Sequence, residues 1–285
     1  MDAVPEVPPE TTMGAVELTV SDLARSRHFY EAAIGLRALD EGDGRLVLGA
    51  GAEPLLALVE EPGSRPSVGH TGLFHFALLL PDRPSLARWL AHAARDRVPL
   101  TGLSDHFVSE ALYLDDPDRH GIELYADRPR EVWEGQVFER MTSEPLDVDG
   151  LLAELGDSAQ EPFDGLHDGT RMGHVHLRVA DVADTVAFYR GVLGFELMAQ
   201  LGPHAAFLAA GGYHHHVGAN VWESSGAGPA PAGTASLRHA TVVFPEATAR
   251  DAAAARVADA GGEIEARSDG IVVRDPAGNA LLLAA

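Results

Sequence analysis

The chain has 285 residues, enough for two compact units, and it contains no cysteine. Disulfides, zinc fingers and thiol nucleophiles are therefore excluded, and any metal ion must be held by histidine and carboxylate side chains. Its 43 acidic side chains outnumber its 21 basic ones, all of them arginine, and the formal net charge is −22. This excess argues against binding to nucleic acid or to an anionic membrane through charge.

Residues 1–12, MDAVPEVPPETT, are acidic and rich in proline. They lack the basic start and the apolar core of a secretory signal peptide. No stretch of the chain approaches the roughly 18 apolar residues that a transmembrane helix needs. We therefore expect a short disordered leader on a cytoplasmic protein that makes no contact with a membrane.

One pattern of strand and helix occurs four times along the chain, starting near residues 14, 72, 173 and 237. Alternating apolar residues, typical of a half-buried strand, run into a proline or an acidic residue and then into a helical pattern of about three turns. The first and third copies agree best, VSDLARSRHFYEAAIGL against VADVADTVAFYRGVLGF. In these copies Asp22 and Asp181 lie where the N-cap of a helix belongs.

Further strand signals follow the second and fourth helices and contain similar turns, in DDPDRHGIELYAD from residue 115 and VRDPAGNALLLAA from residue 273. In each turn proline presets one backbone torsion and glycine tolerates the positive one. Each copy thus predicts a strand, a helix and three more strands. We expect an α+β protein of four βαβββ modules, with modules one and two in a first half over 13–127, a linker over 128–171, and modules three and four in a second half over 172–285.

The βαβββ repeat and its Asp-Pro turn resemble the vicinal oxygen chelate (VOC) superfamily of glyoxalases, bleomycin-resistance proteins and extradiol dioxygenases. The likeness covers nearly the whole chain after residue 13. Longer strings, among them LFHFALLLPDR, MTSEPLDVDGLL and GGYHHHVGANVW, resemble the four-module bacterial catechol 2,3-dioxygenases of the Bacillus type. The resemblance implies two VOC barrels, each made of two modules, and a divalent metal held on a concave sheet by residues of first and last strands.

The ligand positions implied by the resemblance can be compared module by module. On the first strands they fall at Ala15, His75, His174 and His239, and on the last strands of modules two and four at Glu123 and Leu282. Pairing module two with module three assembles His75, Glu123 and His174. This set of two histidines and one carboxylate suits non-haem Fe(II), which we expect as the cofactor, and Mn(II) would suit the same donors.

The other pairings leave this set incomplete. Modules one and two together have Ala15 in place of one histidine, and modules three and four have Leu282 in place of the carboxylate. We therefore expect modules two and three to pair around the metal. Modules one and four would then form a barrel without a metal, in which His239 is a structural histidine.

Three consecutive histidines, His214, His215 and His216, precede an apparent strand. In extradiol dioxygenases a histidine that is not a ligand projects toward the metal from the last strand of the module that donates the first histidine. The resemblance of the His-His pair to the family's motif points to His216, with His215 beside it. All three histidines cannot face the metal, because alternation puts His214 and His216 on one face and His215 on the other. An imidazole suits proton transfer, since its ordinary pKa of about 6.5 lets it accept and return a proton near neutral pH.

Other side chains complete the expected site. Tyr113 matches a tyrosine that hydrogen-bonds the substrate oxygen in the family, although a core aromatic residue is an equally open interpretation. Asp105 and His106 resemble an Asp-His pair near the same strand, but two extra residues precede the tyrosine here. Alternation along the first strand of module three turns His176 toward the cavity. The catalytic candidates are His215, His216 and Tyr113, and the substrate-binding candidates are His106 and His176.

The resemblance implies cleavage of catechol or a substituted catechol beside its two hydroxyl groups, with O2 as the co-substrate. The expected partners are a small aromatic diol and O2, and the superfamily often forms homo-oligomers. Two alternatives stay open. A glyoxalase-like lyase or isomerase would take a further carboxylate or glutamine ligand from the other module, where Asn220 is the nearest candidate. A metal-free resistance protein that binds small molecules would need no ligands.

Overall fold

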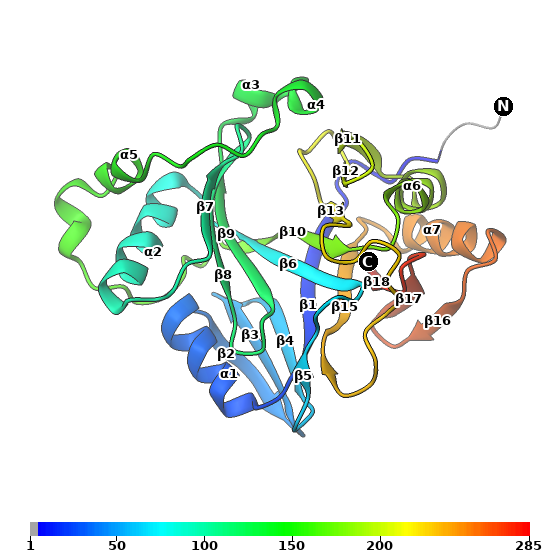
Figure 1. Ribbon diagram of the computed structural model, residues 1–285, viewed down its shortest axis with the longest axis horizontal. Helices are drawn as coiled ribbons and strands as arrows, with labels where there is room; N and C mark the ends of the chain where they lie inside the picture. The colour runs from blue at the N-terminus through cyan, green and yellow to red at the C-terminus, as the bar shows by residue number, and fades with distance from the viewer. Residues whose placement is uncertain (1–4) are drawn as a thin grey trace.

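The computed structural model of the protein describes residues 5–285, apart from the side chains of residues 159 and 160 (Figure 1). Module one consists of β1 (Thr12–Val20), α1 (Leu23–Phe29) with its π-helical continuation η1 (Tyr30–Ile34), β2 (Arg37–Gly42), β3 (Arg45–Ala50) and β4 (Glu53–Glu60). Module two consists of β6 (Gly72–Leu79), α2 (Arg83–Asp96), β7 (Gly102–Asp105), β8 (Ser109–Asp115) and β9 (Gly121–Asp127).

Modules three and four repeat this order. Module three consists of β10 (Arg171–Arg178), α6 (Val182–Val186) with its π-helical continuation η3 (Ala187–Leu193), β11 (Glu196–Leu201), β12 (Ala205–Ala209) and β13 (Val217–Asn220). Module four consists of β15 (Leu237–Val243), α7 (Ala247–Asp259), β16 (Ile264–Arg267), β17 (Gly270–Arg274) and β18 (Ala280–Ala284). The α+β class and the four βαβββ modules are therefore confirmed.

Three of the module helices begin at an aspartate that caps the first turn. The carboxylates of Asp22 and Asp181 each accept a hydrogen bond of 2.9 Å from the backbone amide three residues later. Asp82 accepts the corresponding bond of 2.8 Å at the start of α2. Such caps satisfy amides that have no partner within the helix, and each stabilises it by about 1 kcal/mol.

The strands form two eight-stranded sheets. Sheet I joins modules one and four in the order β16-β17-β18-β15-β1-β4-β3-β2, and sheet II joins modules three and two in the order β11-β12-β13-β10-β6-β9-β8-β7. The joins are antiparallel, between β1 and β15 in sheet I and between β6 and β10 in sheet II. The module pairing inferred from the ligand positions is confirmed. A separate small sheet pairs β5 (Arg65–Pro66) with β14 (Thr234–Ala235).

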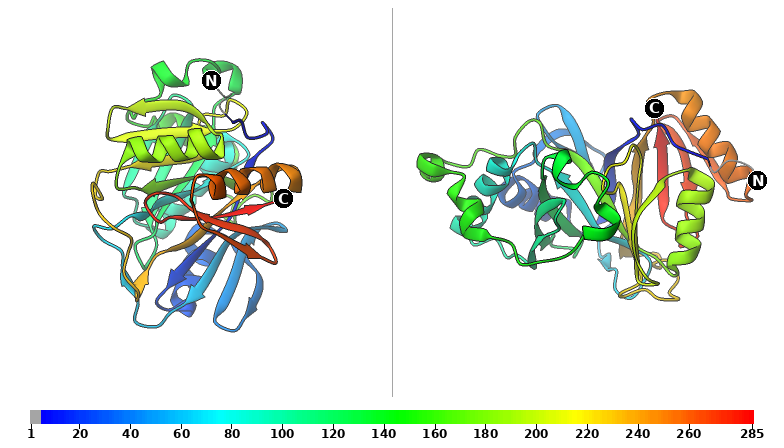
Figure 2. Two further views of the ribbon diagram at one scale, coloured as in Figure 1. Left: turned by 90° about the vertical axis from the view of Figure 1, so that its right-hand side faces the viewer. Right: turned by 90° about the horizontal axis from the view of Figure 1, so that it is seen from above.

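Helices cover the outer faces of the sheets. The helices α6 and α7 lie together on one flank of the molecule, where α7 packs against η3 (Figure 2). On the opposite flank α2 packs against η1, and the indole N–H of Trp89 donates to the carbonyl of Ile34 at 3.1 Å. Alternate residues of the central strands, such as Val175 and Leu177 of β10, are buried in the main apolar core. The opposite faces of these strands do not pack in this core and can line cavities.

The segment expected as a linker, 128–171, contains four short helical elements. These are α3 (Arg130–Trp133), α4 (Val137–Arg140), α5 (Val148–Ala153) and the 3-10 helix η2 (Gly156–Gln160). In Figure 1, α3 and α4 lie above the strands of module two, and α5 lies beside α2. This path carries the chain around module two to the start of β10, where module three can pair with module two.

The segment expected as a disordered leader ends where β1 begins. Residues 1–4 lie outside the described residues. Val7 is buried, and its backbone N–H donates to the carbonyl of Gly194 at 3.0 Å. This part of the expected leader is therefore packed against module three. Over residues 5–285 no helix combines the length and the apolar character that crossing a bilayer requires.

Two buried tyrosine–aspartate pairs connect helices and turns of different modules. The hydroxyl of Tyr30, in module one, donates to Asp116 of module two at 2.9 Å, and that of Tyr189, in module three, donates to Asp275 of module four at 3.3 Å. Each aspartate begins an Asp-Pro turn and also accepts two backbone N–H groups of that turn. Burial, and then the carboxylate that it faces, raises the pKa of each tyrosine well above its ordinary value, so both hydroxyls stay protonated and donate.

We expect Tyr30→Phe to lower the free energy of unfolding by about 1–3 kcal/mol, because it removes a donor from a buried carboxylate. Tyr189→Phe removes the longer of the two bonds and should cost less. Urea denaturation followed by circular dichroism measures both values. A Tyr189→Phe loss equal to or larger than the Tyr30→Phe loss would contradict this ranking.

Candidate metal centre

Three side chains that can ligate a metal converge on the concave face of sheet II. Nε2 of His75, in β6, lies 3.0 Å from Oε2 of Glu123, in β9, and Nε2 of His174, in β10, lies 3.1 Å from the same oxygen. The two Nε2 atoms are 3.4 Å apart. All three side chains are buried. Within the described part of the chain, they form the one group of histidine and acidic side chains with metal-ligand spacing.

Neighbouring central strands bring these residues together. The strand β6 pairs with β10 on one side, antiparallel, and with β9 on the other side, parallel. In this register Ala77, two residues after His75, pairs with His174 on one side and with Glu123 on the other. Because residues two apart on a strand share a face, the small side chain of Ala77 lies on the ligand face and leaves space between the flanking ligands.

The donor atoms have the chemistry and spacing of a metal site. An octahedral ion with bonds of about 2.1 Å at right angles places neighbouring donors about 3.0 Å apart, close to the three distances between His75, Glu123 and His174. Two imidazoles and one carboxylate on one face of an ion are the donors of non-haem Fe(II) sites. The residues therefore fit a divalent metal of this kind.

The electrostatics of the site favour the protonation states that bind metals. Burial would raise the pKa of Glu123, but the imidazoles of His174 and His75 outweigh it and hold that pKa well below its usual range. Burial lowers the pKa of His174 to about 4, against the opposing effect of Glu123. At neutral pH the site therefore presents an ionised carboxylate beside a neutral imidazole, the forms in which these groups coordinate a metal.

A cavity of about 600 Å³ opens in front of the three ligands. Its walls are largely apolar and aromatic, with Phe74, Phe207 and Trp222 on the side of His176. The linker contributes Met141 and its two following residues to the wall. No arginine lies among the cavity-lining residues that the structure describes, and the chain contains no lysine.

The substrate-binding candidates and Tyr113 line this cavity. Nδ1 of His106 donates to the carbonyl of Thr142 at 2.7 Å, so in the neutral ring Nε2 accepts from the hydroxyl of Tyr113, also at 2.7 Å. Burial, and then the charge of Glu123, raises the pKa of Tyr113 well above 10. His176 is buried, and Nε2 of its ring has no hydrogen-bond partner among the described residues.

Asp105, which we expected beside His106 in the site, does not line the cavity. Its carboxylate forms two bonds of 2.6 Å with the guanidinium of Arg128 and accepts the backbone N–H of Phe107. Both charges are therefore paired outside the cavity, where they hold the end of β7 to the end of β9.

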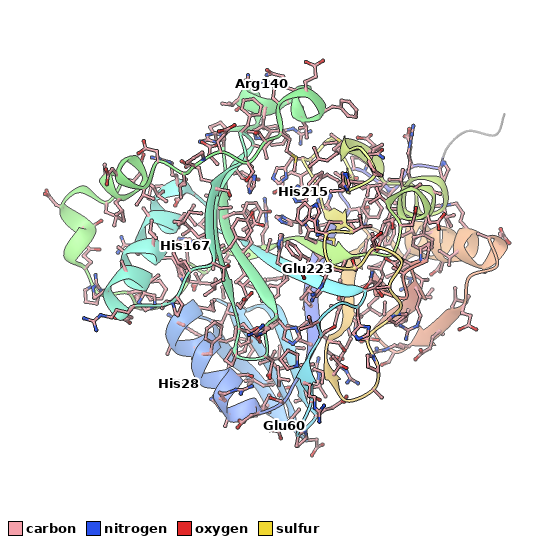
Figure 3. All side chains as sticks on the ribbon, viewed as in Figure 1. His28, Glu60, Arg140, His167, His215 and Glu223 are labelled. Atoms are coloured by element: carbon pink, nitrogen blue, oxygen red, sulfur yellow. The ribbon has the colours of Figure 1, made fainter. Side chains whose placement is uncertain are left out.

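The histidine run is oriented differently from the expectation. His215, and not His216, lines the cavity, with its ring centroid 4.0 Å from that of His174; Figure 3 shows His215 projecting between the strands of modules two and three. His216 faces a second cavity of about 480 Å³, and its Nδ1 accepts from the backbone N–H of Ala210. His214 is fully buried and bonds to Asp127 at 2.9 Å.

The reason for this correction is the local backbone. Strand alternation would apply to the histidines only if the strand included them, but β13 begins at Val217 and the chain bends at residues 214 and 216. Before the bends, Gly211 and Gly212 have positive φ angles of 58° and 64°, a conformation that glycine adopts without steric cost. The face assigned by alternation therefore does not extend to His216.

Several residues near the site are not among the candidates expected from the sequence, above all Asp127. It lies four residues after Glu123 on β9, so strand alternation from Glu123 places Tyr125 and Asp127 on the same face as the ligand. That signal was available in the sequence. No comparable signal marks Met141, because it reaches the wall through the path of the linker.

In sheet I the corresponding positions hold other contacts. His239 lies with Nδ1 3.8 Å from Oε1 of Glu17. Glu17 also bonds to Arg45 at 3.1 Å and to Arg238 at 3.2 Å, so two guanidinium groups already neutralise this carboxylate. Leu282, at the position of the missing glutamate, packs in a small apolar cluster.

Comparisons with known proteins place both halves of the chain in one family. The model of the Glyoxalase/Bleomycin resistance protein/Dioxygenase superfamily matches residues 12–124 and 171–283. A relative named catechol-2,3-dioxygenase, from Bacillus subtilis (strain 168), is 41% identical over 281 residues, which cover 96% of each chain.

Solved structures share the fold at low sequence identity. A proposed dioxygenase from Bacillus subtilis subsp. subtilis str. 168 has a TM-score of 0.66 at 15% identity, covering 99% of this chain and 86% of the other. Glyoxalase I from Zea mays has a TM-score of 0.58 at 18% identity, covering 96% and 92%. With the family model matching both halves of its four-module fold, the chain belongs to the Glyoxalase/Bleomycin resistance protein/Dioxygenase superfamily.

Proposed function

We propose that the protein is an extradiol dioxygenase, which opens the ring of catechol or a substituted catechol with O2 at an Fe(II) centre. The observation that carries the proposal is the set of His75, Glu123 and His174 facing one cavity. The named activity of the relative that is 41% identical over 96% of the chain supports the same reaction.

In this proposal His75, Glu123 and His174 would hold the iron, which would supply Lewis-acid chemistry to the diol and O2. The protein residues around it handle the protons. His215 lies with its ring centroid 4.0 Å from that of His174, and burial lowers the pKa of its imidazole well below the usual range, so the ring is neutral. A neutral imidazole has one unprotonated nitrogen, and in this proposal that nitrogen accepts the proton of a catechol hydroxyl. The hydroxyl oxygen of Tyr113, whose proton is donated to His106, can accept a hydrogen bond from a substrate hydroxyl, and the unpartnered Nε2 of His176 also faces the substrate.

The reaction balances without a further reductant. Both atoms of O2 enter the product, and the ring bond between a hydroxyl-bearing carbon and its neighbour outside the diol breaks. Catechol would yield 2-hydroxymuconic semialdehyde, with the proton held by His215 returned to the product. The walls around the reacting groups are largely apolar.

Strand register favours this reaction over a glyoxalase-like one. On β9 the carboxylate ligand Glu123 pairs with Ala77, which lies two residues after His75 on β6. The equivalent residue on β13 is Gly218, which pairs with His176, two residues after His174 on β10. A Cβ atom at Gly218 would lie 2.9 Å from the ring of His176. The place where a second carboxylate would enter the site is therefore a glycine. Asn220, the other candidate, uses its Oδ1 to accept the backbone N–H of Trp222.

The proposal predicts a specific assay result. Protein loaded anaerobically with Fe(II), given catechol and then exposed to air, should form a yellow ring-opened product with one O2 consumed per catechol. Visible absorbance and an oxygen electrode measure the two quantities together. If fully loaded protein consumes no O2 with catechol or its alkyl and aryl derivatives, the proposed reaction is wrong.

Metal content tests the ligand set separately. Glu123→Gln and His174→Ala should each weaken Fe(II) binding by at least about 100-fold, since even partners behind the ligands contribute 10–100-fold. His239→Ala, at the position in sheet I that corresponds to His75, is the matched control and should keep the affinity of the parent. Titration calorimetry under anaerobic conditions measures all three. Equal losses in the control and in the ligand variants would refute the assignment.

The walls of the cavity predict a preference for uncharged substituents. A carboxylate on the ring substituent would be buried without a guanidinium or ammonium partner, because no arginine lines the described cavity, the chain has no lysine, and Asp115 lies in the same wall. We expect kcat/KM to fall at least about tenfold for a carboxylated catechol relative to its methyl ester, a difference of roughly 1.4 kcal/mol. Steady-state kinetics on such pairs, matched in shape, separates charge from size. Equal values for acid and ester would contradict the prediction.

A further inference from the structure

A chain of buried and half-buried hydrogen bonds runs from the proposed active site to the end of β9. Nδ1 of His215 lies 2.8 Å from Nδ1 of His214, and Nε2 of His214 lies 2.9 Å from Oδ1 of Asp127. The hydroxyl of Tyr213 lies 2.9 Å from Oδ2 of Asp127, and the hydroxyl of Tyr125 lies 2.8 Å from that of Tyr213. The ligands His75, Glu123 and His174 are not members of this chain.

The donors and acceptors of this chain can be ordered from Asp127. An ionised carboxylate only accepts hydrogen bonds, so Tyr213 donates its O–H to it and accepts that of Tyr125. For the same reason His214 donates its Nε2–H to Asp127. In a neutral imidazole the other nitrogen is then an acceptor, and Nδ1 of His214 must receive the N–H of His215. The unprotonated nitrogen of His215 is therefore Nε2.

The surroundings hold this arrangement in place. The side chain of His214 is fully buried, with its ring centroid 3.9 Å from that of Tyr213 and 5.6 Å from that of Trp133. Trp133 is itself fixed, because its indole N–H donates to the carbonyl of Arg128 at 2.9 Å. The ring of His214 therefore has little freedom to turn over and exchange its two nitrogens.

We propose that Asp127, acting through His214, positions His215 and selects the tautomer of His215 that presents an unprotonated Nε2 to the substrate. This inference rests on the proposed function for its catalytic consequence, but the tautomer itself does not depend on it. Asp127 and His214 are positioning residues here. In serine proteases a buried aspartate likewise sets the tautomer of the catalytic histidine.

Asp127→Asn tests the proposal with little change in shape. The O–H of Tyr213 keeps the amide oxygen as its acceptor, so the amide N–H group faces Nε2 of His214 and makes that atom an acceptor. The order of the chain then reverses, and His215 should carry its proton on Nε2. Long-range ¹H–¹⁵N spectra of ¹⁵N-histidine-labelled protein, recorded with and without diamagnetic Zn(II), report the tautomer, and a His215→Asn variant assigns the signal.

Two further variants separate positioning from a purely structural role. Asp127→Glu restores a carboxylate acceptor and should restore the parent tautomer. Tyr213→Phe removes the other donor to Asp127 but leaves the bond to His214, and it too should keep the parent tautomer. A structural role alone would lower the thermal stability of these variants without reversing the tautomer in Asp127→Asn.

The change of tautomer in Asp127→Asn should also lower kcat at constant iron content. For Asp127→Asn we expect kcat to fall about 100-fold, the scale of one general base, with KM changed less than about threefold. Asp127→Glu should recover part of this loss. A proton on Nε2 of His215 in the parent protein, or an unchanged tautomer in Asp127→Asn, would overturn the proposal. If the protein does not cleave catechols, the spectra still decide the tautomer, so the two failures are distinguishable.

Discussion

The antiparallel pairing of β6 with β10 is the interaction on which the rest of the site depends. It joins modules two and three and brings His75 and His174 to within 3.4 Å, although they are 99 residues apart in the chain. The parallel pairing of β9 with β6 then adds Glu123. A pairing within each half of the chain would have left each candidate site without one ligand, as the positions of Ala15 and Leu282 show. The route of the linker around module two makes the productive pairing possible.

The concave face of sheet II also explains why polar residues are buried on a central strand. His174, His176 and Arg178 alternate on β10 with core residues, and all three are buried. Arg178 offsets the cost of its burial by donating to the carbonyl of Leu73 through two nitrogens, at 3.0 and 2.7 Å. Burial nevertheless lowers its pKa, against the opposing charge of Glu223. Such a face would be unfavourable in a core, but it is suitable for a cavity lined with polar groups.

Sheets I and II show how one fold carries different chemistry. Both have the same order of strands and similar Asp-Pro turns closed by a buried tyrosine. In sheet I the ligand face has instead become a charged contact, in which Glu17 is held by Arg45 and Arg238. The fold therefore determines the positions from which side chains can ligate a metal. The residues at those positions determine whether a metal site is present.

The sequence by itself determined the four modules and their helix caps, because these follow from local periodicity, turn chemistry and the spacing of repeats. Its resemblance to the VOC superfamily gave the ligand positions, among them Glu123, and strand alternation placed His174 and His176 on the cavity side. The count of ligands was then enough to infer which modules pair. Only the tertiary structure decided which histidine of the run enters the cavity. That choice depends on bends after Gly211 and Gly212 and on contacts with strands 40 to 90 residues away, which no local pattern encodes. For the same reason the bond between Asp127 and His214, which spans 87 residues, and the wall formed by Met141 became visible only when the chain was folded.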